Sequence, residues 1–407
     1  MKLNGNILFV THWSFKDALV QTFTLPYVDI IRKIIPPEKK IIVVTFEHEK
    51  LALDEKEKLT IKKEWEKRNM QLLPLTYKRF GIKKMIGVIG QLMQLWKIVR
   101  KEHISVIHAF CSPASSFGYL LSKFTGAKLV VDGYEPHAES MVEAGAWKRS
   151  GAAFQILFKL EKILSHKAVH IIASDAGMKE YAKEKYEFDL KDYFIKPACI
   201  DFNTFFPRPK NVTLLHALKL TDKIVCVYAG KLGGMYLNEE VFDFVKSCYE
   251  HWGDRFRFLL LTPTSDEIVA RHMQKIGIPA DIVIKRFVFH KEISNYLSLG
   301  DFAINPQAPI PSKRYGSPLK NGEYWAMGLP IVISPEISVD SDIISANNIG
   351  VVINLQRKEN MAEAVKQIDR LLRNNSRETL QQKIFSVARK YRSFDIAEDI
   401  YPSIYGK

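Results

Sequence analysis

The sequence has little cysteine and no long apolar run. Only four of its 407 residues are cysteine, and no two of them form a CxxC pair. This spacing argues against a disulfide framework and against a zinc site, so we interpret the cysteines as reduced structural thiols. No apolar run is long enough to span a membrane, and the apolar stretch within residues 1–13 is too short for a signal peptide. We therefore expect a cytoplasmic location.

The signatures of several enzyme classes are also absent. The sequence lacks G-x-S-x-G, HExxH and GxxxxGK[ST], which makes a serine hydrolase, a zinc protease or a P-loop nucleotide hydrolase a poor interpretation. Asp340 and Asp342 have the spacing of a metal-binding pair, but an apolar helical segment follows them, and such residues usually cap helices. We therefore expect no metal.

The chain has a formal net charge of +14, and the excess is larger in its first half. No RNA-binding aromatic signature or recognition-helix motif accompanies this charge, so we expect no nucleic acid partner. An anionic membrane surface and an acidic substrate remain as the alternative partners of the basic chain. Residues 78–102 surround an apolar body with basic side chains. The segment fits either a helix lying on a membrane or a domain helix that packs its apolar stripe on a sheet.

Short apolar segments alternate with helical patterns along the whole chain. This alternation predicts an α/β fold with parallel sheets covered on both faces, and 407 residues suffice for two such domains. A proline-rich linker at 196–210 separates them. We predict two doubly wound, Rossmann-like domains, 1–200 and 201–385, facing a cleft. The expected strands are 7–10, 40–45, 106–110, 128–131, 168–173, 193–196, 223–230, 256–262, 281–287, 301–306, 330–334 and 350–354.

Residues 317–334 contain the strongest candidate site. Ser317 is expected to cap a helix that ends at Gly328, and Lys320 and Glu323 share one face of it because they are three residues apart. Helix amides and Lys320 favour an anion, while Glu323 can accept hydrogen bonds from ribose hydroxyls. The stretch suggests a nucleoside diphosphate; a plain capped helix with solvated charges is the alternative.

Other polar residues follow strands of the second half, where ligands of parallel sheets bind. Glycines allow close backbone approach, and basic side chains attract phosphate. The loop at 307–317 adds Lys313 or Arg314. The donor-binding candidates at these strand ends are Gly230, Lys231, Gly233, Arg286 and Asn305.

The first half offers histidines and acids at strand ends. Asp132 and His137 follow the strand 128–131, and a histidine or acid there can position an acceptor hydroxyl, so both are predicted to be catalytic. A turn and a solvated loop are the alternatives. His12 and His108 follow or end earlier strands and are the acceptor-binding candidates, although a core position is common for such histidines.

The chain resembles GT-B glycosyltransferases of the retaining, family-four type. The resemblance is carried by the loop 230–236, by Ser317-Pro318-x-Lys320-x-x-Glu323 and by the linker 197–207, and it is strongest over residues 224–353. It implies that the second domain binds a sugar nucleotide, with Glu323 on the ribose and Lys320 and Lys231 on the diphosphate. It also implies that the first domain holds the acceptor and that a last helix within 386–407 crosses back to it.

The sequence departs from the family at two positions. An acid pair would need an acid at 315, where Tyr315 stands, and the usual glycine-arginine-leucine loop is Gly230-Lys231-Leu232, with no second lysine soon after it. The Ser-Pro-x-Lys variant resembles members that build bacterial surface polysaccharides. These departures bear on the contacts to the donor sugar and on the role of Lys231.

The resemblance and the residues lead to one functional hypothesis. The expected enzyme is a retaining hexosyltransferase that moves sugar from a nucleoside diphosphate sugar to a glycan or lipid-linked acceptor, with Lys320 stabilising the leaving diphosphate and no metal cofactor. It would act in the cytoplasm or at the inner membrane face. A nucleotide-sugar epimerase of the same fold and a catalytically silent, partner- or membrane-binding member remain as alternatives.

Overall fold

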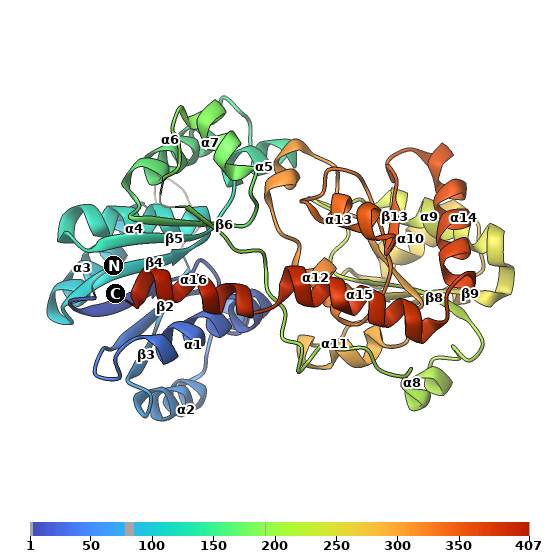
Figure 1. The fold of residues 1–407 in the computed structure, drawn as a ribbon, viewed down its shortest axis with the longest axis horizontal. Coiled ribbons are helices and arrows are strands. Elements are labelled where there is room, and N and C mark those ends of the chain that lie inside the picture. The colour runs from blue at the N-terminus through green and yellow to red at the C-terminus, as the bar shows by residue number, and fades with distance from the viewer. Residues whose placement is uncertain (1–2, 78–84, 192, 407) are drawn as a thin grey trace. The chain divides into compact units, whose positions relative to one another are not determined.

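The computed structural model describes residues 3–77, 85–191 and 193–406. The chain forms two compact units (Figure 1). Unit 1 comprises Met1–Val142, Trp147–Pro197 and Phe394–Lys407, and unit 2 comprises Glu143–Ala146 and Ala198–Ser393. Each unit is described by itself below.

Unit 1 is built on a seven-stranded parallel sheet of order β3-β2-β1-β4-β5-β6-β7. Its central strands are nearly continuous apolar runs because helices cover both faces. The strands are β1 (Asn6–Val10), β2 (Ile41–Glu47), β3 (Met70–Thr76), β4 (Ile104–Phe110), β5 (Lys128–Tyr134), β6 (His170–Ala173) and β7 (Tyr193–Ile195).

Helices connect these strands and pack in pairs, α1 against α16 and α3 against α4. The helix α16 comes from the chain's last segment, so residues far apart in sequence complete one core. The helices of unit 1 are α1 (Leu25–Ile34), α2 (Glu55–Glu66), α3 (Met85–Lys101), α4 (Cys111–Thr125), α5 (His137–Glu143), α6 (Ala152–Lys167), α7 (Met178–Tyr186) and α16 (Asp395–Tyr405).

One strand of unit 1 was not predicted. β3 pairs with β2 in parallel register and contains Pro74, which lacks the N–H that a ladder needs. Proline is tolerated because β3 is the edge strand of the sheet. The sequence pattern therefore does not indicate this strand, because proline is unfavourable in most strands, although the edge position permits it.

Unit 2 contains a six-stranded parallel sheet of order β10-β9-β8-β11-β12-β13. Its core includes the fully buried Tyr324 and Trp325 of α12 and Ile384 of α15. The strands are β8 (Ile224–Ala229), β9 (Phe256–Leu261), β10 (Val283–Arg286), β11 (Phe302–Asn305), β12 (Ile331–Ile333) and β13 (Gly350–Val352). The helices are α8 (Val212–Ala217), α9 (Glu239–Trp252), α10 (Asp266–Ile276), α11 (His290–Leu297), α12 (Leu319–Ala326), α13 (Asp340–Asn347), α14 (Met361–Arg373) and α15 (Arg377–Arg392).

The two sheets confirm the predicted fold class, with two doubly wound, Rossmann-like units. Apart from the short segment Glu143–Ala146, the chain passes between the units after Pro197 and again after Ser393. The chain returns to unit 1 only after Ser393, because α15 packs inside unit 2 through Leu380, Ile384 and Ala388. Among the described residues, none of the helices has the length and apolar character that a bilayer crossing requires. Residues 78–84, the first part of the basic segment 78–102, lie outside the described residues.

A buried ion pair of unit 2 lies where the chain enters this unit after Pro197 and leaves it after Ser393. The guanidinium of Arg392 lies 2.5 and 2.6 Å from the two carboxylate oxygens of Asp340 and also donates to Ser317. Ser317 accepts from the amide of Ala198 at 2.9 Å, and Ile200 donates its amide to the carbonyl of Arg392 at 2.8 Å. The outgoing and returning segments are therefore held at one point of unit 2.

This network corrects two predictions about caps. The residue before α12 is Pro318, without a side-chain cap, so the expected capping by Ser317 is wrong. Val339, not an aspartate, precedes α13, and Asp340 binds Arg392. Both side chains are used by the returning end of α15, which lies far away in sequence. The predicted helix end is confirmed, because α12 stops at Ala326 and Gly328 takes a positive φ of 72°.

Candidate functional site

The charges of three lysines of unit 2 act on the side chain of Tyr236. Burial raises the pKa of Tyr236, but the charges of Lys320, Lys313 and Lys231 outweigh burial and hold that pKa below its ordinary value. The ammonium of Lys320 lies 3.9 Å from the centre of the Tyr236 ring, a cation–π distance. The lysines come from three elements: the loop after β8, the short helix Pro311–Tyr315 and the first turn of α12. Together they form a positive patch suited to an anion.

The glycine after β8 makes room for Lys320. A Cβ at Gly230 would lie 2.5 Å from Cε and 2.9 Å from Nζ of Lys320, well inside contact distance. Gly233 takes a positive φ of 77°, which side chains disfavour. In this structure the glycine gives space to a lysine side chain, and the close approach of this loop to a ligand stays a prediction. Lys231 itself is exposed, and its carbonyl accepts from the hydroxyl of Tyr228.

Glu323 lies one helical turn after Lys320 and pairs with a histidine. Its Oε1 is 2.7 Å from Nε2 of His290, the first residue of α11, and the carboxylate is only 5 % exposed. Burial lowers the pKa of His290, but the hydrogen bond and charge of Glu323 prevail, so that pKa lies above its ordinary value. One carboxylate oxygen is thereby fixed in position, while Oε2 keeps capacity to accept further hydrogen bonds.

The other donor candidates lie in different surroundings. Asn305 is buried at the end of β11, donates to Oδ1 of Asn321 at 2.8 Å and accepts from the amide of Gln307. Ser317 is held by Ala198 and Arg392, as described above. Arg286 ends the edge strand β10, separated from β8 by β9, with an exposed side chain. These contacts favour support of the loops for Asn305 and Ser317, while the binding role of Arg286 stays a prediction.

In unit 1, Asp132 and His108 belong to a buried polar cluster. The ammonium of Lys196 lies 3.1 Å from Oδ1 of Asp132, at ion-pair distance although outside hydrogen-bond geometry. Oδ2 is 2.7 Å from the hydroxyl of Tyr401 and 3.2 Å from Nε2 of His108, whose Nδ1 is 2.7 Å from the hydroxyl of Tyr405. All five side chains are nearly or fully buried.

Charge balance sets the protonation of this cluster. Burial raises the pKa of Asp132, but the charge of Lys196 and the hydrogen bond from His108 outweigh it, so that pKa is low and the carboxylate is ionised. Burial lowers the pKa of His108 more than Asp132 raises it, so the imidazole is neutral. Nε2 therefore carries the proton given to Asp132, and Nδ1 accepts from Tyr405. This geometry favours a structural role for both residues. The predicted catalytic role of Asp132 and the predicted acceptor-binding role of His108 require contact with a substrate, and neither side chain has exposed surface.

His12 and His137 lie nearer to the surface and close to each other. Burial is the main reason why the pKa of His12 falls to about 4, and His137 and His48 contribute further because a charge on either opposes a charge on His12. His12 follows β1 and His137 begins α5 after β5, so both stand at carboxyl ends of strands. A neutral imidazole at His12 can accept a proton or hydrogen bond, which suits the predicted contact with an acceptor.

A buried acid supports the start of α5. Oε1 of Glu161 accepts from the amide of Ala138 at 3.1 Å, and Oε2 is 3.1 Å from the hydroxyl of Tyr186. Burial raises the pKa of Glu161 to about 8, because these hydrogen bonds offset only part of the loss of hydration. Sequence analysis missed this residue, since an isolated glutamate on α6 has the appearance of a surface charge.

We expect the substitution Glu161→Gln to remove a pH dependence of stability. The folded pKa of about 8 lies above the unfolded value of 4.5, so wild-type stability is full below pH 4.5 and falls as pH rises to 8. The slope is about 1.4 kcal/mol per pH unit. Urea unfolding of both proteins at several pH values measures it. The glutamine variant should be the more stable protein at pH 8, and parallel curves would refute the buried proton.

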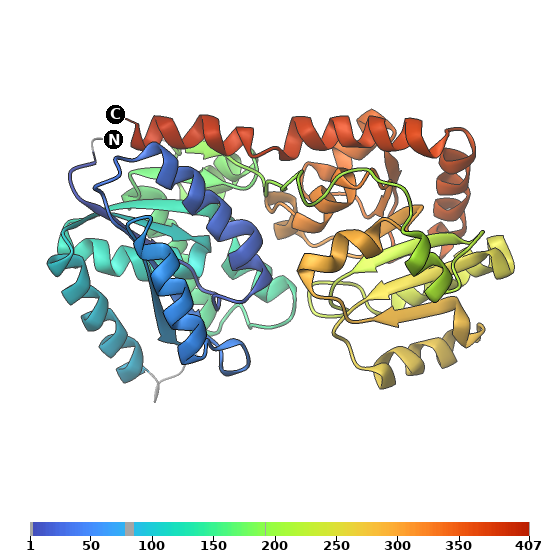
Figure 2. The same cartoon turned by 90° about the horizontal axis from the view of Figure 1, so that it is seen from below.

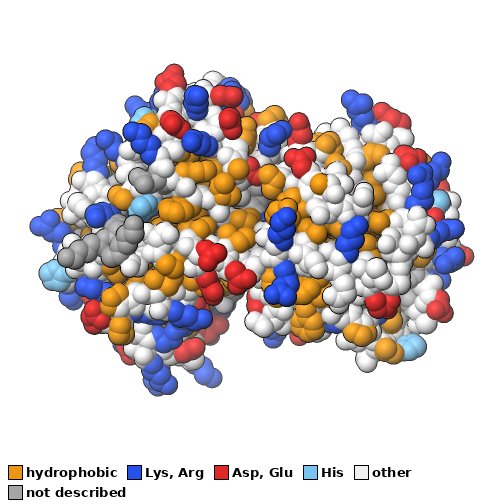
Figure 3. Space-filling view, viewed as in Figure 1, with side chains coloured by type: hydrophobic (Ala, Val, Ile, Leu, Met, Phe, Trp, Pro, Cys, Tyr) orange, Lys and Arg blue, Asp and Glu red, His pale blue; other side chains and the backbone are white. Residues whose placement is uncertain are grey.

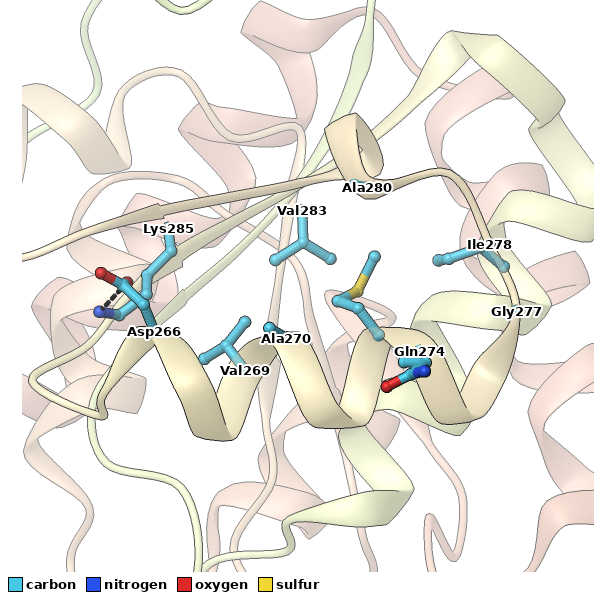
Figure 4. A pocket seen from close by; sticks show the side chains of 10 residues that line it. Asp266, Val269, Ala270, Gln274, Gly277, Ile278, Ala280, Val283 and Lys285 are labelled. Carbon is cyan, nitrogen blue, oxygen red and sulfur yellow. Dashed lines mark hydrogen bonds and ion pairs between the residues drawn. The ribbon is translucent and has the colours of Figure 1, made fainter.

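Unit 2 also has a hollow on its outer side, between α10 and the edge strand β10 (Figure 4). Its volume is about 400 Å³, its floor is mostly apolar, and the ion pair between Asp266 and Lys285 at 2.6 Å stands at one end. None of its lining residues belongs to the lysine patch or the Glu323 pair. Within residues 3–77, 85–191 and 193–406, no group of three or more His, Cys, Asp or Glu is placed to hold a metal ion.

Comparisons with known proteins agree with this architecture. The Anabaena protein HepE, solved in complex with UDP, has a TM-score of 0.71 at 12 % identity over 98 % of this chain and 99 % of its own. Sucrose-phosphate synthase from Thermosynechococcus elongatus has 0.72 at 12 % identity over 98 % of both chains. WaaG, a glycosyltransferase involved in lipopolysaccharide biosynthesis, has 0.72 at 12 % over 98 % and 100 %. No curated protein sequence matches the chain.

Two parallel sheets, each in its own Rossmann-like unit, give the chain the GT-B fold. Residues 223–374, which include the lysine patch and Glu323, match the family described as glycosyl transferases group 1. The match lies within unit 2, and the enzymes of that family transfer sugar from a nucleotide sugar.

Proposed function

We propose that the chain transfers a sugar from a nucleoside diphosphate sugar, bound on unit 2, to a glycan or lipid-linked acceptor held by unit 1. The observation that carries the proposal is the contact of Lys320 with the ring of Tyr236, one helical turn before Glu323, where the charges of Lys313 and Lys231 also act on the tyrosine. Binding of UDP and UDP-glucose by HepE supports a nucleotide-sugar donor. The involvement of WaaG in lipopolysaccharide biosynthesis supports a role in cell-surface polysaccharide assembly.

The patch would act on the leaving group. Negative charge grows on the diphosphate as the glycosidic bond breaks, and fixed cations stabilise that charge most where water is scarce. Lys320 stands at the first turn of α12, so helix amides and the dipole add to its charge. The leaving phosphate oxygen can take the acceptor proton, and the described lysines supply the charge for this step without a metal ion. Closure around the donor would keep water from the sugar.

Glu323 would hold the nucleoside. His290 fixes Oε1, so Oε2 is oriented to accept from a ribose hydroxyl. In unit 1, His12 and His137 would position the acceptor hydroxyl, because both stand at strand ends and His12 is neutral at physiological pH. The location that follows is cytoplasmic, with contact to the inner membrane face if the acceptor is lipid-linked.

A panel of UDP, GDP, ADP and CDP tests the donor site. A ligand that binds only the folded protein raises its melting temperature, so one nucleotide should do so selectively. Glu323→Gln keeps the shape of the side chain but loses a charge-assisted hydrogen bond. We expect it to weaken the binding of that nucleotide about tenfold. Glu363→Gln, on the surface of α14, is the matched control and should bind as wild type. Equal affinities in both variants would remove Glu323 from the site.

Product analysis separates the transfer from its alternative. The purified enzyme is incubated with the nucleotide sugar that the panel selects, without an acceptor. An epimerase of the same fold would convert the sugar at a rate independent of any acceptor. A transferase should leave the donor nearly intact until an acceptor is added, because group transfer requires the second hydroxyl.

A further inference from the structure

The helix α3 is apolar on two separate faces. Its inner face packs into unit 1, with Leu95 fully buried and Val99 3 % exposed. On the other side Ile89, Met93 and Trp96 are 50, 57 and 40 % exposed. These three residues have the spacing i, i+4, i+7, so they form one continuous stripe along the helix. The packing explanation of the apolar pattern therefore accounts for only half of it.

Cations border this stripe. Lys97, Arg100 and Lys101 are exposed, and the guanidinium of Arg100 lies 5.6 Å from the centre of the Trp96 ring. By helical spacing Arg100 continues the line of Ile89, Met93 and Trp96. The sequence of α3 contains no aspartate or glutamate. We call these three apolar and three basic residues the α3 outer face.

The α3 outer face carries charge of one sign only. Over the face shown in Figure 3, basic side chains of both units are interspersed with acidic ones. On that face the mixed charges identify no partner by themselves. On α3 the cations stand beside exposed apolar side chains without acidic neighbours on the helix. Unit 1 carries the helix on its outside (Figure 2).

We propose that the α3 outer face docks on the surface of an anionic lipid bilayer. An apolar stripe with a tryptophan enters the headgroup region, and lysine and arginine at its border attract anionic headgroups. A second copy of this chain fits less well, because pairing two outer faces would bring cations of both copies together. The occupant that matches both the apolar area and the charge is therefore lipid.

The position of α3 in the sheet links this surface to the proposed function, on which this step rests. The helix connects β3 to β4, so its first residues lie at the carboxyl edge of the parallel sheet. His12 and His137 stand at the same edge, after β1 and β5. A bilayer against α3 would thus present a lipid-linked acceptor at the edge of unit 1 that carries these histidines.

Sedimentation with vesicles tests the docking. The whole protein is mixed with vesicles of phosphatidylcholine alone or of phosphatidylcholine with phosphatidylglycerol, and we expect binding only to the second. The double variant Met93→Ser/Trp96→Ser should bind at least about tenfold more weakly, because it removes the apolar insertion. Changing Lys97, Arg100 and Lys101 to glutamine should cost about fivefold for each cation.

Matched controls keep the test specific. Leu59→Ser on α2 and Phe289→Ser in unit 2 change apolar side chains that are 52 and 65 % exposed, and they should leave vesicle binding unchanged. The α3 variants should keep the nucleotide-induced thermal shift of wild type, so loss of docking is distinguishable from failure of the donor site. Unaltered vesicle binding in the α3 variants would overturn the proposal, as would a concentration-dependent dimer that these substitutions abolish.

Discussion

Replacing Lys320 with alanine is expected to lower kcat for sugar transfer about 100- to 1000-fold, the usual loss when one preorganised charge donor to a developing anion is removed. Lys320 is the member of the lysine patch that combines contact with the Tyr236 ring, space provided by Gly230 and a place in the first turn of α12. Donor affinity should fall less than kcat, since the charge on the diphosphate is largest in the transition state.

Steady-state kinetics with the nucleotide sugar selected by the binding panel measure this effect. Lys246→Ala is the matched control, because that lysine lies on α9 in a surface ion pair with Glu250 at 3.8 Å. Its kcat should equal that of wild type. If Lys320→Ala raised KM alone and left kcat intact, the lysine would bind the donor without stabilising the departing diphosphate.

The substitution Asp132→Asn is expected to destabilise unit 1 by about 3–5 kcal/mol, because it leaves a buried cation without its counter-ion. Lys196 would keep only the ring of Tyr27, whose centre is 3.3 Å from its ammonium, and the more distant Phe23. Two hydrogen bonds, from Tyr401 and His108, would weaken with the loss of charge. Amide hydrogen exchange should accelerate in peptides of unit 1, including α16, and remain unchanged in unit 2.

Two further variants define the origin of this effect. Asp29→Asn breaks an exposed pair with Arg68 and should change stability by less than about 1 kcal/mol. Adding Lys196→Met to Asp132→Asn removes both buried charges and should restore a large part of the loss. A double variant as unstable as the single one would show that the hydrogen bonds, not the charge, carry the stability.

Much of the fold follows from local patterns in the sequence. Apolar runs between helical segments identify the positions of every strand except β3, whose Pro74 contradicts a strand pattern. The lysines that gather at Tyr236 could be placed near one another, because parallel strands end at the same edge of a sheet. Tyr236 itself was inside the recognised glycine loop, but no property of the sequence indicated that Lys320 would lie over its ring.

What could not be predicted depends on contacts between distant segments. Asp132 and His108 have the features of site residues until Tyr401 and Tyr405, four apart on α16, cover them from the other end of the chain. The sequence suggested that Ser317 and Asp340 cap helices, but Arg392 donates hydrogen bonds to both side chains. His290 was not among the predicted site residues, and its hydrogen bond with Glu323 joins α11 to α12, two helices that are far apart in sequence. Local spacing carries no information about such partners.

The return of the chain to unit 1 also has a consequence for biosynthesis. Residues 395–405 leave the ribosome after the whole of unit 2, yet they supply the tyrosines that bind Asp132 and His108. Unit 2 has all of its own strands earlier and can become compact while the core of unit 1 is still open. The two units are therefore completed in the opposite order to their synthesis. Unit 1 reaches its final fold only after α16 has been synthesised, and until then this helix does not enclose Asp132 and Lys196.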